Sequence, residues 1–194
     1  SFFFFKVLLI RYRNFYLSFL GLVLYVTTPR ILGDSFLYKD VLFLSILMFA
    51  IYYLIKSINS QNLKYLILFS LFSALSVNLR LFAILIPIFF IFLIIIKNFD
   101  LMNYKKNLSK ILFYLFSFLF FLYIFWPYLW SNPISNFFDL FNSLNNDLIN
   151  VKLFYNNDYI SNKTLPDTYI LNWMILTSPF IQTILFFLGF FYCF

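Results

Sequence analysis

Two aspartates and their cationic neighbours interrupt an otherwise apolar chain and are the residues best suited to chemistry. Asp34 and Asp40 lie six residues apart in TPRILGDSFLYKD (28–40), together with Arg30 and Lys39. A carboxylate can remove a proton from a hydroxyl or an amine, and its hard oxygens suit Mg²⁺, Mn²⁺ or Ca²⁺. The structural alternative is a solvated turn in which Asp40 caps the following helix. We therefore take Asp34 and Asp40 as candidate catalytic residues.

Arg80 is the strongest candidate for substrate binding, because it stands between two long apolar runs. Its planar guanidinium suits phosphate, and an ionisable residue in such a setting is a functional hypothesis by default. The alternative is an interfacial anchor at a helix end. Trp130 would stack on a sugar or belong to an aromatic belt at the membrane interface. The candidate substrate-binding residues are Arg80, Arg30, Lys39, Asn78 and Trp130.

Some kinds of chemistry are excluded by residues that the chain lacks. It has no His and no Glu, and its one Cys is Cys193. Histidine general bases, histidine-based metal sites and a disulfide within the chain are therefore ruled out. A divalent cation held by Asp oxygens stays open as a cofactor, and no cofactor is certain.

The elements that must position these residues are membrane helices. The chain is 63% hydrophobic, 26% aromatic and only 11% charged, a composition that a soluble domain of 194 residues could not bury. Its apolar runs are too long and too uniform for the strands of a membrane barrel. We expect an all-α, polytopic integral membrane bundle that forms a single transmembrane domain over residues 1–194. About six spans are predicted, at 15–28, 41–55, 65–79, 81–96, 111–126 and 173–194.

One pair of spans requires a reversal of the chain. As one helix, 65–96 would measure about 48 Å, well beyond the ~30 Å hydrocarbon core. A tight turn at SVNLR (76–80) would solve this and bring Asn78 and Arg80 to one membrane face.

Charge predicts the orientation of the bundle. With the N-terminal end in the cytoplasm, nine cations fall inside: Lys6, Arg11, Arg13, Lys56, Lys64, Lys97, Lys105, Lys106 and Lys110. Five cations fall outside, with six of the seven aspartates, and only Asp100 is inside. This asymmetry follows the positive-inside rule. The expected location is a bacterial inner (plasma) membrane, and no nucleic-acid partner is expected.

A long outer loop is predicted over 127–172, well beyond the usual length of a connection. Within it, NPISNFFDLFNSLNNDLI (132–149) places its apolar residues at helical intervals. We expect an amphipathic helix lying on the outer membrane surface.

Four segments, in order, resemble those of a family of membrane enzymes. They are TPRILGDSFLYKD, ALSVNLRLFAILIPI, FWPYLWSNPISNFF and LPDTYILNWMILTSPF. Their order resembles that of the GT-C-type glycosyltransferases related to family 39, which include protein mannosyltransferases and lipid A aminoarabinose transferases. Family members often carry a His in the LP-x-x-Y stretch, where this chain has Asp167 and Thr168.

The resemblance implies an enzyme that moves a sugar from a polyprenyl-phosphate carrier to a glycan, lipid or protein acceptor on the outer face. The family's main acidic motif usually precedes the region seen here. The chain also starts with Ser and ends within an apolar run, so we expect it to be part of a longer protein. Two alternatives remain: a transporter or flippase for a lipid-linked sugar, and a non-catalytic membrane fragment.

Overall fold

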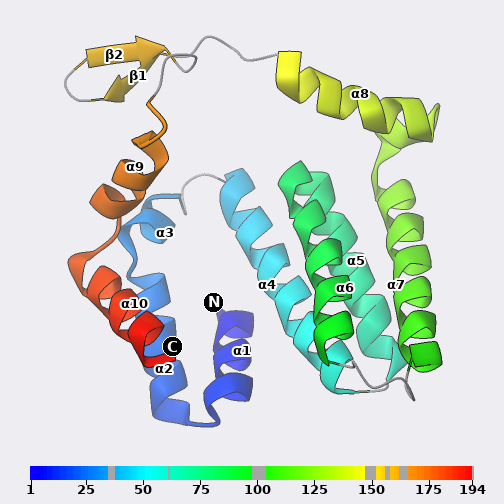
Figure 1. Cartoon of the computed structure of the whole chain (residues 1–194), viewed down its shortest axis with the longest axis horizontal. Helices are drawn as coiled ribbons and strands as arrows, with labels where there is room; N and C mark the ends of the chain where they lie inside the picture. Colours follow the sequence, from blue (N-terminus) through cyan, green and yellow to red (C-terminus); the bar gives the residue numbers. More distant parts are fainter. Residues whose placement is uncertain are drawn as a thin grey trace. The chain divides into compact units, whose positions relative to one another are not determined.

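The computed structural model describes residues 1–34, 38–60, 62–97, 104–146, 152–155, 158–161 and 166–193, and it is mostly helical (Figure 1). The described residues form two compact units, the first of residues 1–27 and 31–131, the second of residues 28–30 and 132–194. Each unit is described by itself. Asp100 and Asp147, which were predicted to lie on the inner and outer sides, are outside the described residues.

The first unit is built from helices joined by short connections. Its α-helices are α1 (Phe2–Tyr12), α2 (Phe15–Val26), α4 (Tyr38–Asn59), α5 (Leu63–Leu79), α6 (Leu85–Lys97) and α7 (Tyr104–Phe125). Two 3₁₀ turns, η1 (Leu81–Ile84) and η3 (Pro127–Leu129), follow α5 and α7. A short helix, α3 (Pro29–Asp34), has residues in both units.

Among the described residues, fewer helices are long enough to span a membrane than the sequence suggests. Lys39–Asn59 and Asn107–Phe125 are long and apolar enough by length and composition. A third would be the pair Tyr169–Thr177 and Phe180–Phe191, if these helices, bent by 111°, form one broken span. The other apolar helices have 10 to 17 residues, whereas a straight crossing takes about 20. The all-α membrane character is thus supported, but six spans are not.

The predicted reversal near 76–80 is present. Helix α5 ends at Leu79, Arg80 adopts an extended backbone with φ −143° and ψ 117°, and η1 leads into α6. The rings of Phe69 in α5 and Phe90 in α6 lie 5.0 Å apart, so the two helices turn back on each other. The extended residue breaks the helix and prevents one 32-residue rod.

The core of the first unit lies around α5. Tyr114 of α7 is fully buried, and its ring lies 4.8 Å from Phe69 and 4.5 Å from Phe90. Its hydroxyl donates to Ser73 Oγ at 3.1 Å. Small residues at helix interfaces let backbones approach closely where lipid supplies no hydrophobic driving force. Four such residues of α5 are fully buried: Ser70, Ser73, Ala74 and Ser76.

The hydroxyl groups of the buried serines donate to backbone carbonyls of their own helix. Ser70 donates to the carbonyl of Ile67, Ser73 to that of Ser70, and Ser76 to that of Phe72, at 2.8 to 3.0 Å. This pairing with the preceding turn lets a hydroxyl be buried at little cost.

Helices α1 and α2 form a close hairpin. Arg13 adopts the left-handed conformation after α1, and the Asn14 side chain accepts from the backbone N–H groups of Tyr16 and Leu17. A Cβ placed on Gly21 would lie 2.7 Å from a methyl group of Leu8, so only glycine permits this approach without a shift.

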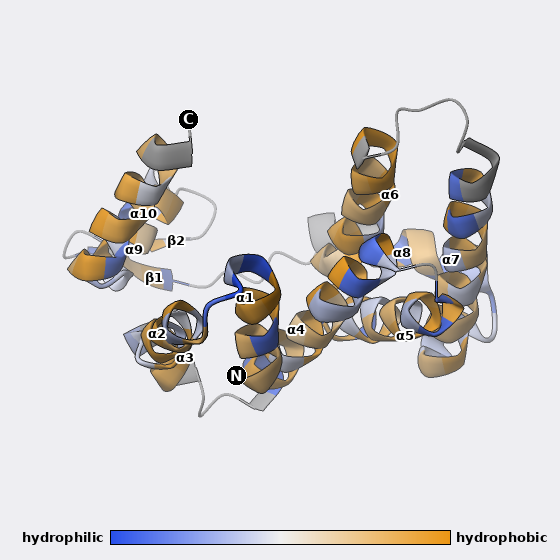
Figure 2. Ribbon diagram, turned by 90° about the horizontal axis from the view of Figure 1, so that it is seen from below, coloured by the Kyte–Doolittle hydropathy of each residue, from blue (hydrophilic) through white to orange (hydrophobic). Residues whose placement is uncertain are grey.

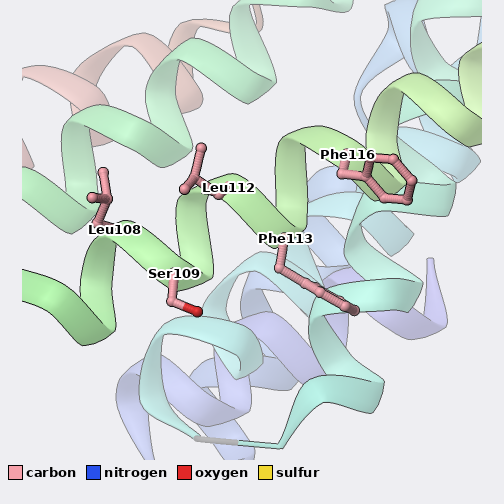
Figure 3. Close-up of a pocket in the computed structure, with 5 residues that line it drawn as sticks. All are labelled: Leu108, Ser109, Leu112, Phe113 and Phe116. Carbon is pink, nitrogen blue, oxygen red and sulfur yellow. The ribbon is translucent and has the colours of Figure 1, made fainter.

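Apolar side chains also cover the outside of the first unit. Figure 2 shows that hydrophobic residues make up most of α4, α5, α6 and α7. One hollow of about 510 Å³ is lined by α7 alone, through Leu108, Ser109, Leu112, Phe113 and Phe116 (Figure 3). Phe116 is 74% exposed. Such a surface fits contact with lipid chains.

The second unit contains the amphipathic segment and the C-terminal helices. Helix α8 (Pro133–Asn146) occupies most of the predicted 132–149 segment. Strands β1 (Lys152–Tyr155) and β2 (Asp158–Ser161) form an antiparallel hairpin that was not predicted.

Two helices follow the hairpin, α9 (Tyr169–Thr177) and α10 (Phe180–Cys193), with a break at Ser178 and Pro179 between them. The predicted span at 173–194 is therefore interrupted. The Tyr155 hydroxyl accepts a hydrogen bond from the Asn172 side chain in α9 at 2.8 Å.

Replacing the buried Ser73 by leucine should destabilise the first unit. A larger side chain would separate α5 from α7 and remove the acceptor of Tyr114, with an expected cost of about 1–3 kcal/mol. Ser45→Leu, at an exposed position of α4, is the matched control and should change little. Thermal unfolding in detergent micelles measures both, and equal midpoints would refute the packing described for α5.

Gly21→Ile should also destabilise the protein, because Leu8 must move out of its packed position to admit a branched side chain. We expect a loss of about 1–3 kcal/mol from overpacking. Gly189→Ile is the control, since a Cβ there meets nothing within 4 Å. The same unfolding assay applies, and a stable Gly21→Ile protein would contradict the close approach of α1 and α2.

Candidate functional site

An ion pair joins two of the predicted site residues. Asp40 lies in the first turn of α4, and Arg80 lies between α5 and η1. Because α4 and α5 form an antiparallel hairpin, the start of one meets the end of the other. Arg80 Nη2 donates to Asp40 Oδ1, with side chains 47% and 35% exposed. A pair this exposed contributes about 0.2–1 kcal/mol.

Two further candidates hold the end of α7. Asn78 Nδ2 donates to the carbonyl of Phe125, and Trp130 Nε1 donates to that of Tyr123 at 2.7 Å. The last four carbonyls of a helix have no partner within the helix, so these bonds satisfy two of them. Pro127 prevents α7 from continuing. Asn78 and Trp130 therefore have a structural role, and their predicted contact with substrate stays a prediction.

The structure thus gathers Asp40, Arg80, Asn78 and Trp130 at one end of the first unit (top of α4, α5 and α7 in Figure 1). Four residues from three sequence regions share this end because the helices run back and forth. Lys39 precedes Asp40 in the first turn of α4 and is exposed. For Arg30 and Asp34 only the backbone in α3 is described, so their side chains lie outside the described part of the structure.

The donors needed for a metal site do not come together in the described part of the chain. No group of three or more carboxylates or thiols gathers among the described residues. Asp40, the described carboxylate at this end, already accepts from Arg80. We therefore derive no step through a divalent cation.

At this end of the unit, Arg80 could exchange its partner Asp40 for another anion. A guanidinium can bind phosphate through two parallel hydrogen bonds, and a phosphate that did so would compete with Asp40. Release of Asp40 would leave a carboxylate able to accept a proton. In the observed state the cation and the carboxylate satisfy each other.

Some features of the site are not evident in the sequence. The capping role of Asn78 depends on α5 and α7 ending at the same level, which no local pattern shows, whereas Trp130 donates to a carbonyl only seven residues before it. The nearby Pro127 was the available signal that α7 must end and that its carbonyls need donors.

Comparison with known proteins gives no match: no family model fits the chain, and none of the curated proteins or solved structures compared is significantly similar. The geometry described above therefore stands on its own.

Exchanging the two charges tests the ion pair. Asp40→Ala and Arg80→Ala should each lower stability slightly, and the double variant should lose less than the sum, by about 0.2–1 kcal/mol. The swapped protein, Asp40→Arg with Arg80→Asp, should recover part of the loss. Unfolding midpoints at low and high salt give the measurement. Strict additivity at low salt would show that the two charges do not interact.

Proposed function

We propose that the chain is part of a membrane glycosyltransferase that transfers a sugar from a polyprenyl-phosphate carrier to an acceptor on the outer face of a bacterial inner membrane. The observation that carries this proposal is the pairing of Arg80 with Asp40 at one end of the helical unit. A phosphate-binding cation and a proton-accepting carboxylate, side by side at a membrane surface, are what this reaction needs. The four ordered sequence segments support the same assignment.

The helices would present this end to the outer side. Asp40 and Arg80 lie at the end opposite Lys56 and Lys110, which the excess of cations assigns to the cytoplasm. We propose that the shorter helices α2, α5 and α6 cross the membrane with α4, α7 and the α9–α10 pair. Flanking polar residues would complete these short crossings.

The proposed reaction uses Arg80 as the site of the donor phosphate. Binding of the phosphate draws the guanidinium away from Asp40. A carboxylate, with Asp34 and Asp40 as candidates, takes the proton of the acceptor hydroxyl or amine as its oxygen or nitrogen attacks the sugar carbon. The bond from that carbon to the phosphate oxygen breaks, and the polyprenyl phosphate leaves with the electron pair, stabilised by Arg80.

Sugar transfer from a polyprenyl-phosphate donor tests the assignment. Arg80→Ala should raise the KM for the donor at least tenfold, because a charged hydrogen bond to phosphate is lost. Asp34→Asn or Asp40→Asn should lower kcat by about a hundredfold or more if that carboxylate is the base. Asp139→Asn, at an exposed position in α8, is the control and should keep the wild-type rate.

Retention of full activity by all three variants would show that the site is wrongly assigned. Movement of a lipid-linked sugar across proteoliposomes without any transfer would instead indicate a transporter or flippase.

A further inference from the structure

The opposite end of the first unit holds a cavity that the proposed reaction does not use. Its volume is about 330 Å³, and it is lined by Ile10, Ile55, Lys56, Asn59, Ser60 and Tyr65. These residues come from the ends of α1 and α4 and the start of α5 (bottom of Figure 1). The volume is within the range of small-molecule pockets, about 300–1,000 Å³.

Lys56 gives this cavity its charge. Its ammonium lies 5.3 Å from the ring centre of Tyr52 and 5.0 Å from that of Tyr65. These rings hold the cation without neutralising it, because they attract it through their electron-rich faces. A bound anion would therefore meet a full positive charge.

A second cation reaches the wall of the cavity. Lys110, from the first part of α7, donates to the carbonyl of Ser60 at 3.4 Å. Lys64 stands exposed in the first turn of α5. The sequence contains no acid between residues 41 and 99 or between 101 and 138, so this end carries a net positive charge.

Ser60 supplies a polar group that needs a partner. Its hydroxyl is buried and has no hydrogen-bond partner among the residues that the structure describes. Buried hydroxyls are nearly always paired, so an exception calls for an explanation. Since Ser60 also lines the cavity, an acceptor oxygen bound there would satisfy it after a rotation of its side chain.

The position of the cavity identifies the kind of ligand. The apolar segment Lys39–Asn59 ends at its rim, and two of its wall residues are isoleucines. The cavity therefore lies where the hydrocarbon of a bilayer gives way to headgroups. Anionic phospholipids give the cytoplasmic leaflet its negative potential, and clustered basic residues beside a span bind them.

We propose that this cavity binds the phosphate of an anionic phospholipid headgroup, with Lys56 and Lys110 as the cations and Ser60 as a hydrogen-bond donor. Ile10 and Ile55 would contact the start of its acyl chains. The site is separate from the Asp40–Arg80 end and does not depend on the proposed glycosyl transfer.

Titration of the whole chain in detergent with dioctanoyl phosphatidylglycerol, followed by native mass spectrometry, tests the proposal. Dioctanoyl phosphatidylcholine and inorganic phosphate, at the same concentrations, are the parallel probes. We expect saturable binding of phosphatidylglycerol and at least tenfold weaker binding of the other two. Equal binding of inorganic phosphate would overturn the lipid assignment and indicate a site for soluble anions.

Variants locate the site. Lys56→Gln and Lys110→Gln should each weaken phosphatidylglycerol binding about fivefold, while Lys56→Arg, which keeps the charge, should bind within about twofold of wild type. Ser60→Ala should weaken binding without lowering the unfolding temperature, because it removes a hydroxyl that has no partner in the described part of the chain. Lys152→Gln, on β1, is the control for loss of one exposed charge. Wild-type affinity in both Lys56→Gln and Lys110→Gln would overturn the proposal.

Discussion

The close packing of α5 against its neighbours is the constraint on which the rest of the first unit depends. Its buried face carries serine and alanine, and the serine hydroxyls bond to the preceding turn. These small side chains leave room for the ring of Tyr114 and fix the height of α7 relative to α5. Since α5 also packs against α4, its register determines what meets at both ends of the unit.

The two ends of the unit differ in charge for that reason. At one end the register places Asp40 beside Arg80 and Asn78 beside the last carbonyl of α7. At the other end Lys110 of α7 lies beside the carbonyl of Ser60, which follows α4. A shift of α5 by one turn, about 5.4 Å, would break the contacts of Arg80 with Asp40 and of Asn78 with α7 together. The contacts of Arg80 and Asn78 thus depend on the packing of the apolar and small residues of α5.

The sequence predicted the parts of this structure that depend on local pattern. The helical class, the reversal before Arg80 and a helix within 132–149 all follow from runs of apolar residues and their interruptions. The β-hairpin was missed because its strands have only four residues each and no strong turn signal. The break of the last span at Ser178 and Pro179 was also missed, although the proline was a visible signal.

The sequence predicted which polar residues share one end of the unit better than it predicted their contacts. The predicted alternation of helix directions was enough to place Arg80 at the same end as Asp40. The order of the helices gave no information on hydrogen-bond partners. The partner of Arg80 and the contact made by Asn78 depend on how far neighbouring helices are shifted along one another, by ångströms. From the sequence, only the number of cations at the opposite end could be predicted. That Lys56 and Lys110 lie near one cavity follows only from the packing of the helices.

If α5 crosses the membrane as proposed, its short length brings the cations at its two ends close to the edges of the hydrocarbon core. Its 17 residues span about 26 Å, less than the ~30 Å of a typical hydrocarbon core. Lys64 at its start and Arg80 after its end must therefore reach outward, or the bilayer must thin around them. Each flanking cation then lies within reach of lipid headgroups or phosphate. In the proposed topology a short central helix thus keeps Lys64 and Arg80 near opposite surfaces of the membrane.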